Sequence, residues 1–260
     1  MDCPGFILTP GSTPVLRSSL LPVPHGFSTR EGGVSVLPHL SSLNLGAGLG
    51  DTEETVSENR ARFFRASLGK EPEKLMTGIQ VHSDRVIAVT RETEAGQEAD
   101  GYVTREKGIA LFVRTADCPP ILLCDPLAGV IGAVHSGWRG TVKGIAAEAV
   151  RQMVSLGADP AFIRAAIGPC IHVCCYEVGD EVADGLHALL GISAEQAVLR
   201  RSGHLFADLP AAIRLTLLRS GLRPDHILAA PDCTCCSPYR FFSHRASGGK
   251  RGLGGAVIEM

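Results

Sequence analysis

The sequence has no long apolar run, no excess of positive charge and no cationic leader. No stretch approaches the roughly eighteen uninterrupted apolar residues of a membrane-spanning helix. The formal net charge is −2, so we expect no basic surface for nucleic acid or anionic lipid. Residues 1–16 carry no cationic segment and are broken by prolines, unlike a signal peptide. These absences predict a cytoplasmic protein that binds neither nucleic acid nor membranes.

The chain also has no internal repeat and no linker long enough to separate domains. With 45% hydrophobic and 20% charged residues, it has enough apolar material for a full core. Strand and helix patterns alternate only partly, and several neighbouring strands resemble hairpins, which favours an α+β fold over a doubly wound one. We therefore expect a single domain over residues 1–260 with a mixed sheet, and an irregular N-terminal segment over residues 1–23.

Hydrophobic periodicity predicts the elements of this domain. Residues 51–69 are predicted to form a helix that Asp51 or Thr52 caps and Gly69 ends. Apolar runs at 121–125 and 130–136 predict a hairpin of two buried strands. Further strands are expected at 85–90, 108–115, 162–169, 226–231 and 256–260, a turn at 99–102, and further helices at 142–157, 176–191 and 207–222.

Nine cysteines are present, an odd number, and two tight runs contain six of them: CIHVCC at 170–175 and CTCC at 233–236. In a cytoplasmic chain thiols stay reduced, so metal binding or catalysis competes with burial as the explanation for these runs. Together they could form a second thiolate site for a metal. Read as Cys-x-Cys-Cys, the second run lacks the Cys-x₂-Cys knuckle of common zinc sites, which favours reduced, partly buried thiols.

His82, Cys118 and His135 each lie at a predicted strand boundary, 36 and 17 residues apart. These spacings are too long for a zinc finger but suit a site assembled by a large fold. Three protein ligands leave a fourth position open for water or substrate, as in catalytic zinc sites, and a Cys/His₂ set could also bind copper. A metal-free pair, with Cys118 as nucleophile and His135 as base, fits the spacing equally well. A purely structural role for each side chain also stays open.

The segment HSGWRGT that follows predicts an anion site. A strand end, a glycine-flanked turn and a helix start would bring free backbone N–H groups together, and Arg139 adds a fork of donors. The alternative is that Gly137 and Gly140 only shape a tight turn while Arg139 faces solvent.

Several motifs resemble those of the bacterial YfiH family, also called DUF152 or the multi-copper polyphenol oxidoreductase laccase family. The resemblance runs from about residue 24 to the end of the chain. The motifs that carry it are HGFSTREGGVS, SLNLG, QVHS, ADG, TADCPPILLCDP, GAVHSGWRGT, IGPCIHVCCYEVGDEV and CTCCSPYRFFSHR. One departure is His172-Val173, where the family more often has small residues such as Gly-Pro. The added histidine beside three cysteines could alter the pocket or bind a metal, or it could simply be packed or exposed.

This resemblance implies a fold, a metal and an activity. The implied fold is a single α+β domain with a mixed β-sheet sandwich flanked by helices, and the implied zinc ligands are His82, Cys118 and His135. Members of the family act as purine nucleoside phosphorylases, which split adenosine, inosine, guanosine or methylthioadenosine with phosphate into base and ribose 1-phosphate, and they also deaminate adenosine. Purine nucleoside and phosphate are therefore the expected partners, and we expect a monomer or a weak homodimer.

The same resemblance suggests roles for individual residues. Zinc held by the three ligands would activate a water for deamination. The residues expected to bind substrate or phosphate, all in polar motifs shared with the family, are Arg30, Asn44, Arg139, His244 and Arg245.

Three alternatives to this activity stay open. One is a hydrolase that edits a peptidoglycan precursor with the same Cys–His site, and another is a non-catalytic metal or nucleotide sensor. The third, a copper polyphenol oxidase, fits poorly, because multi-copper chemistry needs about ten histidines in His-x-His pairs. This chain has nine histidines and no His-x-His pair.

Overall fold

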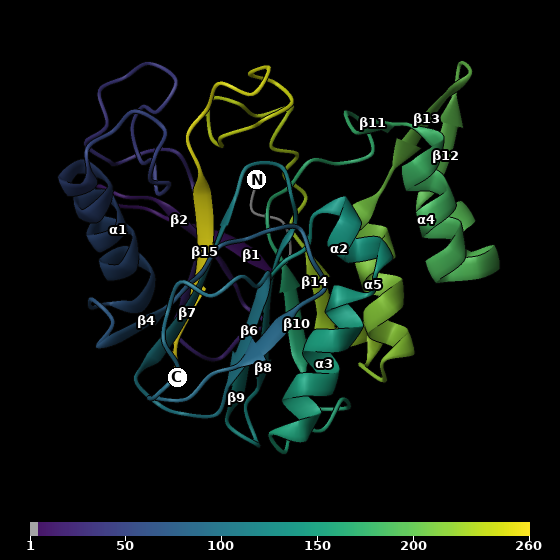
Figure 1. The fold of residues 1–260 in the computed structure, drawn as a ribbon, viewed down its shortest axis with the longest axis horizontal. Coiled ribbons are helices and arrows are strands. Elements are labelled where there is room, and N and C mark those ends of the chain that lie inside the picture. The colour runs from purple at the N-terminus through teal and green to yellow at the C-terminus, as the bar shows by residue number, and fades with distance from the viewer. Residues whose placement is uncertain (1–4) are drawn as a thin grey trace.

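Two six-stranded sheets form the centre of the molecule in a computed structural model that describes residues 5–260 (Figure 1). The first sheet contains, in spatial order, β1 (Phe6–Thr9), β2 (Val15–Ser18), β3 (His25–Ser28), β15 (Gly254–Ile258), β7 (Ile109–Thr115) and β4 (Lys74–Met76). The second contains β14 (Ile227–Ala229), β10 (Arg164–Ile167), β8 (Pro120–Asp125), β9 (Val130–His135), β6 (Gly101–Thr104) and β5 (Val86–Ala88). Each sheet mixes parallel and antiparallel pairs, such as β4–β7 and β15–β7 in the first.

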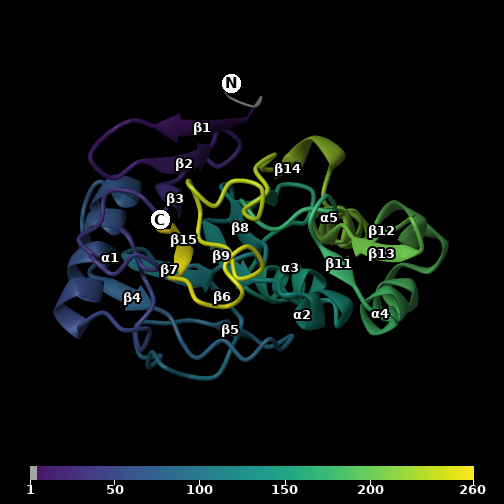
Figure 2. The ribbon, with the colours of Figure 1, turned by 90° about the horizontal axis from the view of Figure 1, so that it is seen from above.

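Helices cover the outer faces of these sheets, except for α4, which packs beside a small third sheet to one side. The helices are α1 (Glu53–Leu68), α2 (Trp138–Val142), α3 (Ile145–Ser155), α4 (Asp180–Leu190) and α5 (Leu209–Arg219), with short 3₁₀ turns at Gly191–Gln196 and Pro224–His226. The third sheet has the order β11 (Glu177–Val178), β13 (His204–Ala207), β12 (Val198–Arg201). Figure 2 shows α1 on the outside of the first sheet and α3 on the outside of the second.

Alternation along the strands explains why both faces of each sheet are buried. Leu111 on β7 and Leu122 on β8 meet in the core between the two sheets. Their neighbours point the other way, so that Phe112 packs under α1 and Leu123 packs under α3 and α5. A period of two residues sends successive side chains to opposite faces. The chain is thus an α+β domain whose mixed sheets form a sandwich flanked by helices, as predicted.

Helix α1 forms where the capping signals predicted it. The Thr52 side chain accepts a hydrogen bond from the Thr55 N–H, and Glu53 and Glu54 occupy the first turn, where the helix dipole favours negative charge. Gly69 ends the helix with φ at 79°, a conformation that costs glycine little. The predicted hairpin is also present, since β8 and β9 pair antiparallel along their whole length.

Other expectations need correction. Residues 1–23 are not wholly irregular, because β1 and β2 form an antiparallel hairpin within this segment. The expected turn at 99–102 is wrong, since Gly101 and Tyr102 begin β6, which pairs with β9. The expected helix at 142–157 is broken by Gly144, whose φ of 83° separates α2 from α3.

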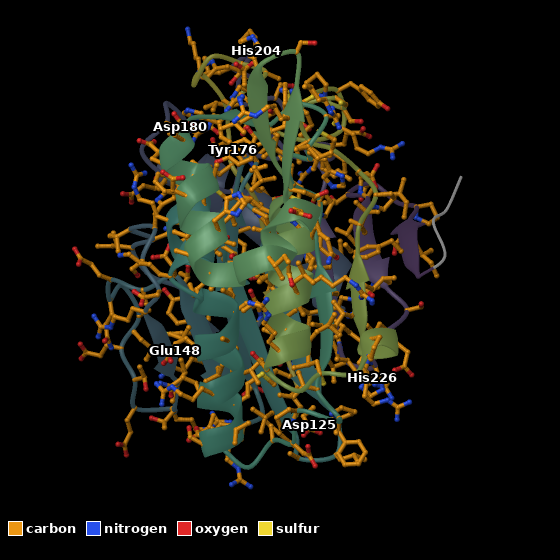
Figure 3. The ribbon with its side chains drawn as sticks, turned by 90° about the vertical axis from the view of Figure 1, so that its right-hand side faces the viewer. Asp125, Glu148, Tyr176, Asp180, His204 and His226 are labelled. Atoms are coloured by element: carbon orange, nitrogen blue, oxygen red, sulfur yellow. The ribbon has the colours of Figure 1, made fainter. Side chains whose placement is uncertain are left out.

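The region between α4 and α5 also differs from the prediction. Residues 176–191 begin with β11 rather than as helix, so α4 starts only at Asp180. The hairpin β12–β13 was not predicted; its residues are mostly half-buried or exposed, which leaves little hydrophobic pattern to detect. Figure 3 shows this hairpin, with His204 at its tip, beside the start of α4. In the part of the chain that the structure describes, no helix is both long and apolar enough to cross a membrane.

Candidate metal-binding active site

His82, Cys118 and His135 come together at one end of the sandwich. Pro120 and His135 are paired across β8 and β9, which places Cys118, just before β8, next to the end of β9. The His82 Nε2 lies 4.0 Å from the Cys118 Sγ, and the rings of His82 and His135 meet edge to face with their centroids 4.9 Å apart. The candidate ligand atoms of all three residues lie within 4.8 Å of one another.

A buried carboxylate, Asp100, orients both histidines. One of its oxygens accepts a hydrogen bond of 2.9 Å from the His135 Nδ1, which leaves the His135 Nε2 free to face the site. The same oxygen accepts the His82 N–H at 3.1 Å, and the other accepts the Ser83 N–H at 2.7 Å. Sequence analysis missed Asp100 as a site residue, although the ADG motif contained it.

The backbone around this site is held in unusual conformations. His82 has a φ of 58° and Asp117, directly before Cys118, has a φ of 88°. Such conformations cost a non-glycine residue about 1–3 kcal/mol and persist only where the surroundings enforce them. The hydrogen bonds from residues 81–83 to Asp100 enforce the first of these, and so fix the ring of His82 against Cys118.

The three charged groups of the site stabilise one another. Burial alone would raise the pKa of Cys118, but the imidazoles of His135 and His82 outweigh it and lower that pKa to about 6. Burial alone would lower the pKa of His135, but Cys118 and Asp100 raise it to about 9. Burial likewise opposes ionisation of Asp100, yet the hydrogen bonds from His135 and Ser83 bring its pKa down to about 2. Without metal, the site at neutral pH therefore holds a thiolate, an imidazolium and a carboxylate.

We expect the metal-free protein to show this low thiol pKa directly. The rate at which iodoacetamide alkylates Cys118 should rise with pH around a midpoint near 6 and be level at pH 8, because only the thiolate reacts. In Asp100→Asn the imidazolium loses its carboxylate partner, so the midpoint should move to higher pH. Peptide mass spectrometry at the Cys118 peptide measures both. A midpoint near 9 in the unmodified sequence would contradict the assignment.

Gly137 is required by its close approach to His82 and Cys118 rather than by its backbone angles. It precedes α2 in an extended conformation, with φ at −62°, that any residue can adopt. A Cβ at this position would lie 2.7 Å from the His82 Cδ2 and 3.2 Å from the Cys118 Sγ. Gly137 therefore does more than shape a turn, because the absence of a side chain here leaves the space that His82 and Cys118 fill.

Gly137→Ala is accordingly expected to weaken metal binding roughly 10–100-fold, since the added methyl group displaces His82. The matched control is Gly179→Ala, which also replaces an extended glycine before a helix but has nothing within 4 Å of the new Cβ. Competition with a chelator measures the affinity of both variants for zinc. Equal affinities would show that the site tolerates the methyl group.

A cavity of about 210 Å³ opens directly onto the three residues. Gln80, Arg114 and Arg251 contribute to its wall. The Nε atoms of Arg114 and Arg251 are buried and make no hydrogen bond. Both arginines are half-buried, and Arg114 also donates from its Nη2 to the Gly78 carbonyl at 2.7 Å. Two half-buried guanidinium groups in the wall of one cavity form a setting for an anion such as phosphate. Sequence analysis missed both arginines, since neither belongs to a recognised anion-binding motif and only the fold brings them together.

None of the five expected substrate residues belongs to the wall of this cavity. Arg139 is exposed on α2 and stacks on the ring of Trp138, 4.4 Å from its centroid. Asn44 is fully buried, and its amide bonds to Gly46, Asp51 and Leu253. Through its bond to Leu253, Asn44 holds the loop before β15 in place.

Of the other three, Arg30 lies in the loop after β3, and His244 and Arg245 lie in the loop before β15. Arg30 donates to the carbonyls of Ser41 and Pro238. His244 is exposed. Arg245 donates to the carbonyls of Cys175 and Glu177 at 3.1 and 3.0 Å. The structure does not bring these residues into the wall of the cavity at Cys118.

The observed arrangement can perform two kinds of chemistry. Cys118, His135 and Asp100 form a nucleophile, a base and an orienting carboxylate, as a metal-free acyl-transfer site would require. The same Cys/His₂ set, with the rear nitrogen of His135 bonded to a carboxylate, also has the donor types and outer hydrogen bond of a zinc site.

Comparisons with known proteins identify the family of this chain. The family model described as "Multi-copper polyphenol oxidoreductase laccase" matches residues 24–260. A purine nucleoside phosphorylase of Deinococcus radiodurans is 41% identical, with 97% of this chain and 95% of that protein covered. Purine nucleoside phosphorylase YfiH of Escherichia coli is 38% identical over 84% of this chain and 86% of that protein.

Solved structures agree with these relatives. The crystal structure of YlmD from Geobacillus stearothermophilus superposes with a TM-score of 0.88 and 34% identity, with 98% of each chain covered. Sequence, length and fold thus agree along the whole chain, and the protein belongs to the YfiH family of laccase-like proteins.

Proposed function

We propose that this protein is a zinc-dependent purine nucleoside phosphorylase that also deaminates adenosine. The observation that carries the proposal is that the His82–Cys118–His135 group and the two arginines Arg114 and Arg251 line one and the same cavity. A metal-ligand set and an anion-binding wall on one cavity suit a reaction between a nucleoside and phosphate. The names of the relatives support the same activity.

The three residues fit zinc in number and chemistry. One thiolate and two imidazoles, with ligand atoms within 4.8 Å of one another, suit a tetrahedral ion that keeps a fourth position open. When bound, the ion would supply a Lewis acid that lowers the pKa of a water molecule towards neutrality. Copper is the alternative ion for a soft site of this kind. A multi-copper centre has less support, because among residues 5–260 the candidate ligand groups contain only two histidines.

The chain's own residues would bind and orient the reactants. Arg114 and Arg251, which line the cavity, would hold phosphate by charge-assisted hydrogen bonds from their guanidinium groups. A phosphate oxygen then forms a bond to C1′ of the ribose as the bond from C1′ to the purine nitrogen breaks. The electron pair of that bond leaves with the base, which takes up a proton. Asp100 keeps His135 and the His82 loop in place during both reactions.

Deamination would use water in place of phosphate. The oxygen of water forms a bond to C6 of adenosine, and the amino group leaves as ammonia to give inosine. Because the two reactions share a substrate but not a nucleophile, phosphate should be needed for one and not for the other.

The test is to incubate metal-quantified protein with adenosine, with and without phosphate, and to separate the products by chromatography. The proposal expects adenine and ribose 1-phosphate only when phosphate is present, and inosine without it. No product from adenosine, inosine, guanosine or methylthioadenosine, with the site loaded with zinc, would refute it. The next substrate to try would then be a peptidoglycan precursor.

A further inference from the structure

Two cysteine runs that are far apart in sequence converge at a second place in the fold. The Sγ atoms of Cys174, Cys175, Cys233 and Cys236 all lie within 4.8 Å of one another. The Cys236 Sγ is 3.5 Å from that of Cys174 and 3.3 Å from that of Cys175, across sequence separations of 62 and 61 residues. This group is separate from the site at Cys118, with which it shares no residue.

We propose that these four cysteines bind one structural Zn²⁺ ion. Four thiolates around zinc, with Zn–S bonds of about 2.3 Å, form a tetrahedron whose edges are about 3.8 Å. The two cited sulfur separations, 3.5 and 3.3 Å, are slightly shorter than this edge and well above the ~2.05 Å of a disulfide. A tetrahedral S₄ donor set is typical of structural zinc.

The spacing of the four cysteines also fits a structural zinc site. This corrects the interpretation that the run at 233–236 lacks a Cys-x₂-Cys knuckle. Cys233 and Cys236 are themselves a Cys-x₂-Cys pair, and Cys235 is one of the two residues between them. Reading the run as Cys-x-Cys-Cys hides this pair, because Cys235 is not part of the group. The other two ligands are adjacent, on the turn that precedes β11.

Turns in the backbone present both pairs to the same point. The Ser237 N–H bonds to the Cys233 carbonyl at 3.0 Å, and the Cys175 and Tyr176 N–H groups both bond to the His172 carbonyl at 2.9 Å. The His172 N–H donates to the Cys233 Sγ at 3.4 Å. Hydrogen bonds of this kind orient metal ligands from outside the coordination sphere.

The zinc would connect two loops that also build the candidate active site. Asp117, which precedes Cys118, accepts a 2.6 Å hydrogen bond from the Thr234 hydroxyl, and its carbonyl accepts the Ile171 N–H at 2.8 Å. The Arg245 N–H bonds to the same carboxylate at 2.7 Å. A metal that joins the two cysteine loops therefore holds in place the segments that fix the conformation of Asp117.

Metal content is the first test. Protein purified with zinc should contain two zinc ions per chain by plasma mass spectrometry, and Cys118→Ser and Cys236→Ser should each contain one. Cys235→Ser is the matched control, because it replaces the adjacent cysteine that is outside the group, and it should keep two. One zinc in the unmodified protein together with none in Cys118→Ser would overturn the proposal, as would two in Cys236→Ser.

A second measurement does not depend on the folding of a variant in the cysteine loops. With Co²⁺ in place of zinc, Cys118→Ser should still show intense thiolate-to-cobalt charge-transfer absorption, roughly fourfold that expected from the single thiolate at Cys118. Mass spectrometry after alkylation without reductant should find these four cysteines alkylated once the metal is removed. A disulfide between the loops in freshly purified protein, or no such absorption, would exclude the site.

Discussion

Replacing Cys118 by alanine is expected to remove the metal from the site and to lower phosphorolysis and deamination together, each by roughly 10³-fold. That loss corresponds to about 4 kcal/mol of transition-state stabilisation. The reason is that Cys118 supplies the one thiolate of the set, and its low pKa of about 6 makes it available at neutral pH. Without it, two imidazoles remain to hold the ion. Product analysis with adenosine, beside metal quantification, measures both effects.

The matched control is Cys124→Ala. Cys124 lies on β8, the strand that follows Cys118, and is fully buried in the core between the sheets, where burial raises the pKa of its thiol to about 12. This variant should lose some stability but retain metal and both activities. If Cys118→Ala kept phosphorolysis while losing deamination, the ion would serve only one of the two reactions.

Arg251→Met is expected to raise the KM for phosphate roughly 10–100-fold, which matches the 1.5–3 kcal/mol of a hydrogen bond to a charged group. The guanidinium lines the cavity beside Cys118 and has a buried Nε–H without a partner. Methionine keeps much of the side-chain length but removes the charge and the donors. Initial rates of phosphorolysis at varied phosphate concentration measure the change.

Lys250→Met is the control, because it removes the neighbouring cation, which is exposed and outside the wall of that cavity. Deamination should be little affected in Arg251→Met, since water replaces phosphate in that reaction. An unchanged KM for phosphate would show that Arg251 does not bind phosphate. Arg139, the arginine expected from the sequence, would then be the next residue to test.

The sequence was most informative where one local pattern carries the information. Thr52 and Gly69 marked the ends of α1, and the apolar runs around Pro126–Gly129 marked the β8–β9 hairpin. His82, Cys118 and His135 could be selected as candidate ligands because each lies near a predicted strand and within a motif that resembles the family's. Their convergence depended on the pairing of Pro120 with His135, which only the fold sets.

Residues whose role depends on long-range contacts could not be predicted in this way. Asp100 bonds to a histidine 35 residues away. The family resemblance includes the motif that contains Asp100, but it suggests no role for this residue. Arg114 and Arg251 meet the cavity from β7 and from the loop before β15. Conversely, Asn44 resembles a polar loop residue in the sequence, yet the structure shows it buried and hydrogen-bonded to the backbone and to the Asp51 carboxylate.

The position of β15 has a consequence for biosynthesis. This strand comes last in the described chain, but it lies inside the first sheet, paired with β3 on one side and β7 on the other. Until residue 258 has been translated, β3 and β7 expose unpaired edges, which invite association with other nascent chains. Arg251 likewise emerges from the ribosome just before that strand. The first sheet and the candidate anion-binding wall can therefore form only after translation has passed these residues, so we expect no activity from shorter nascent chains.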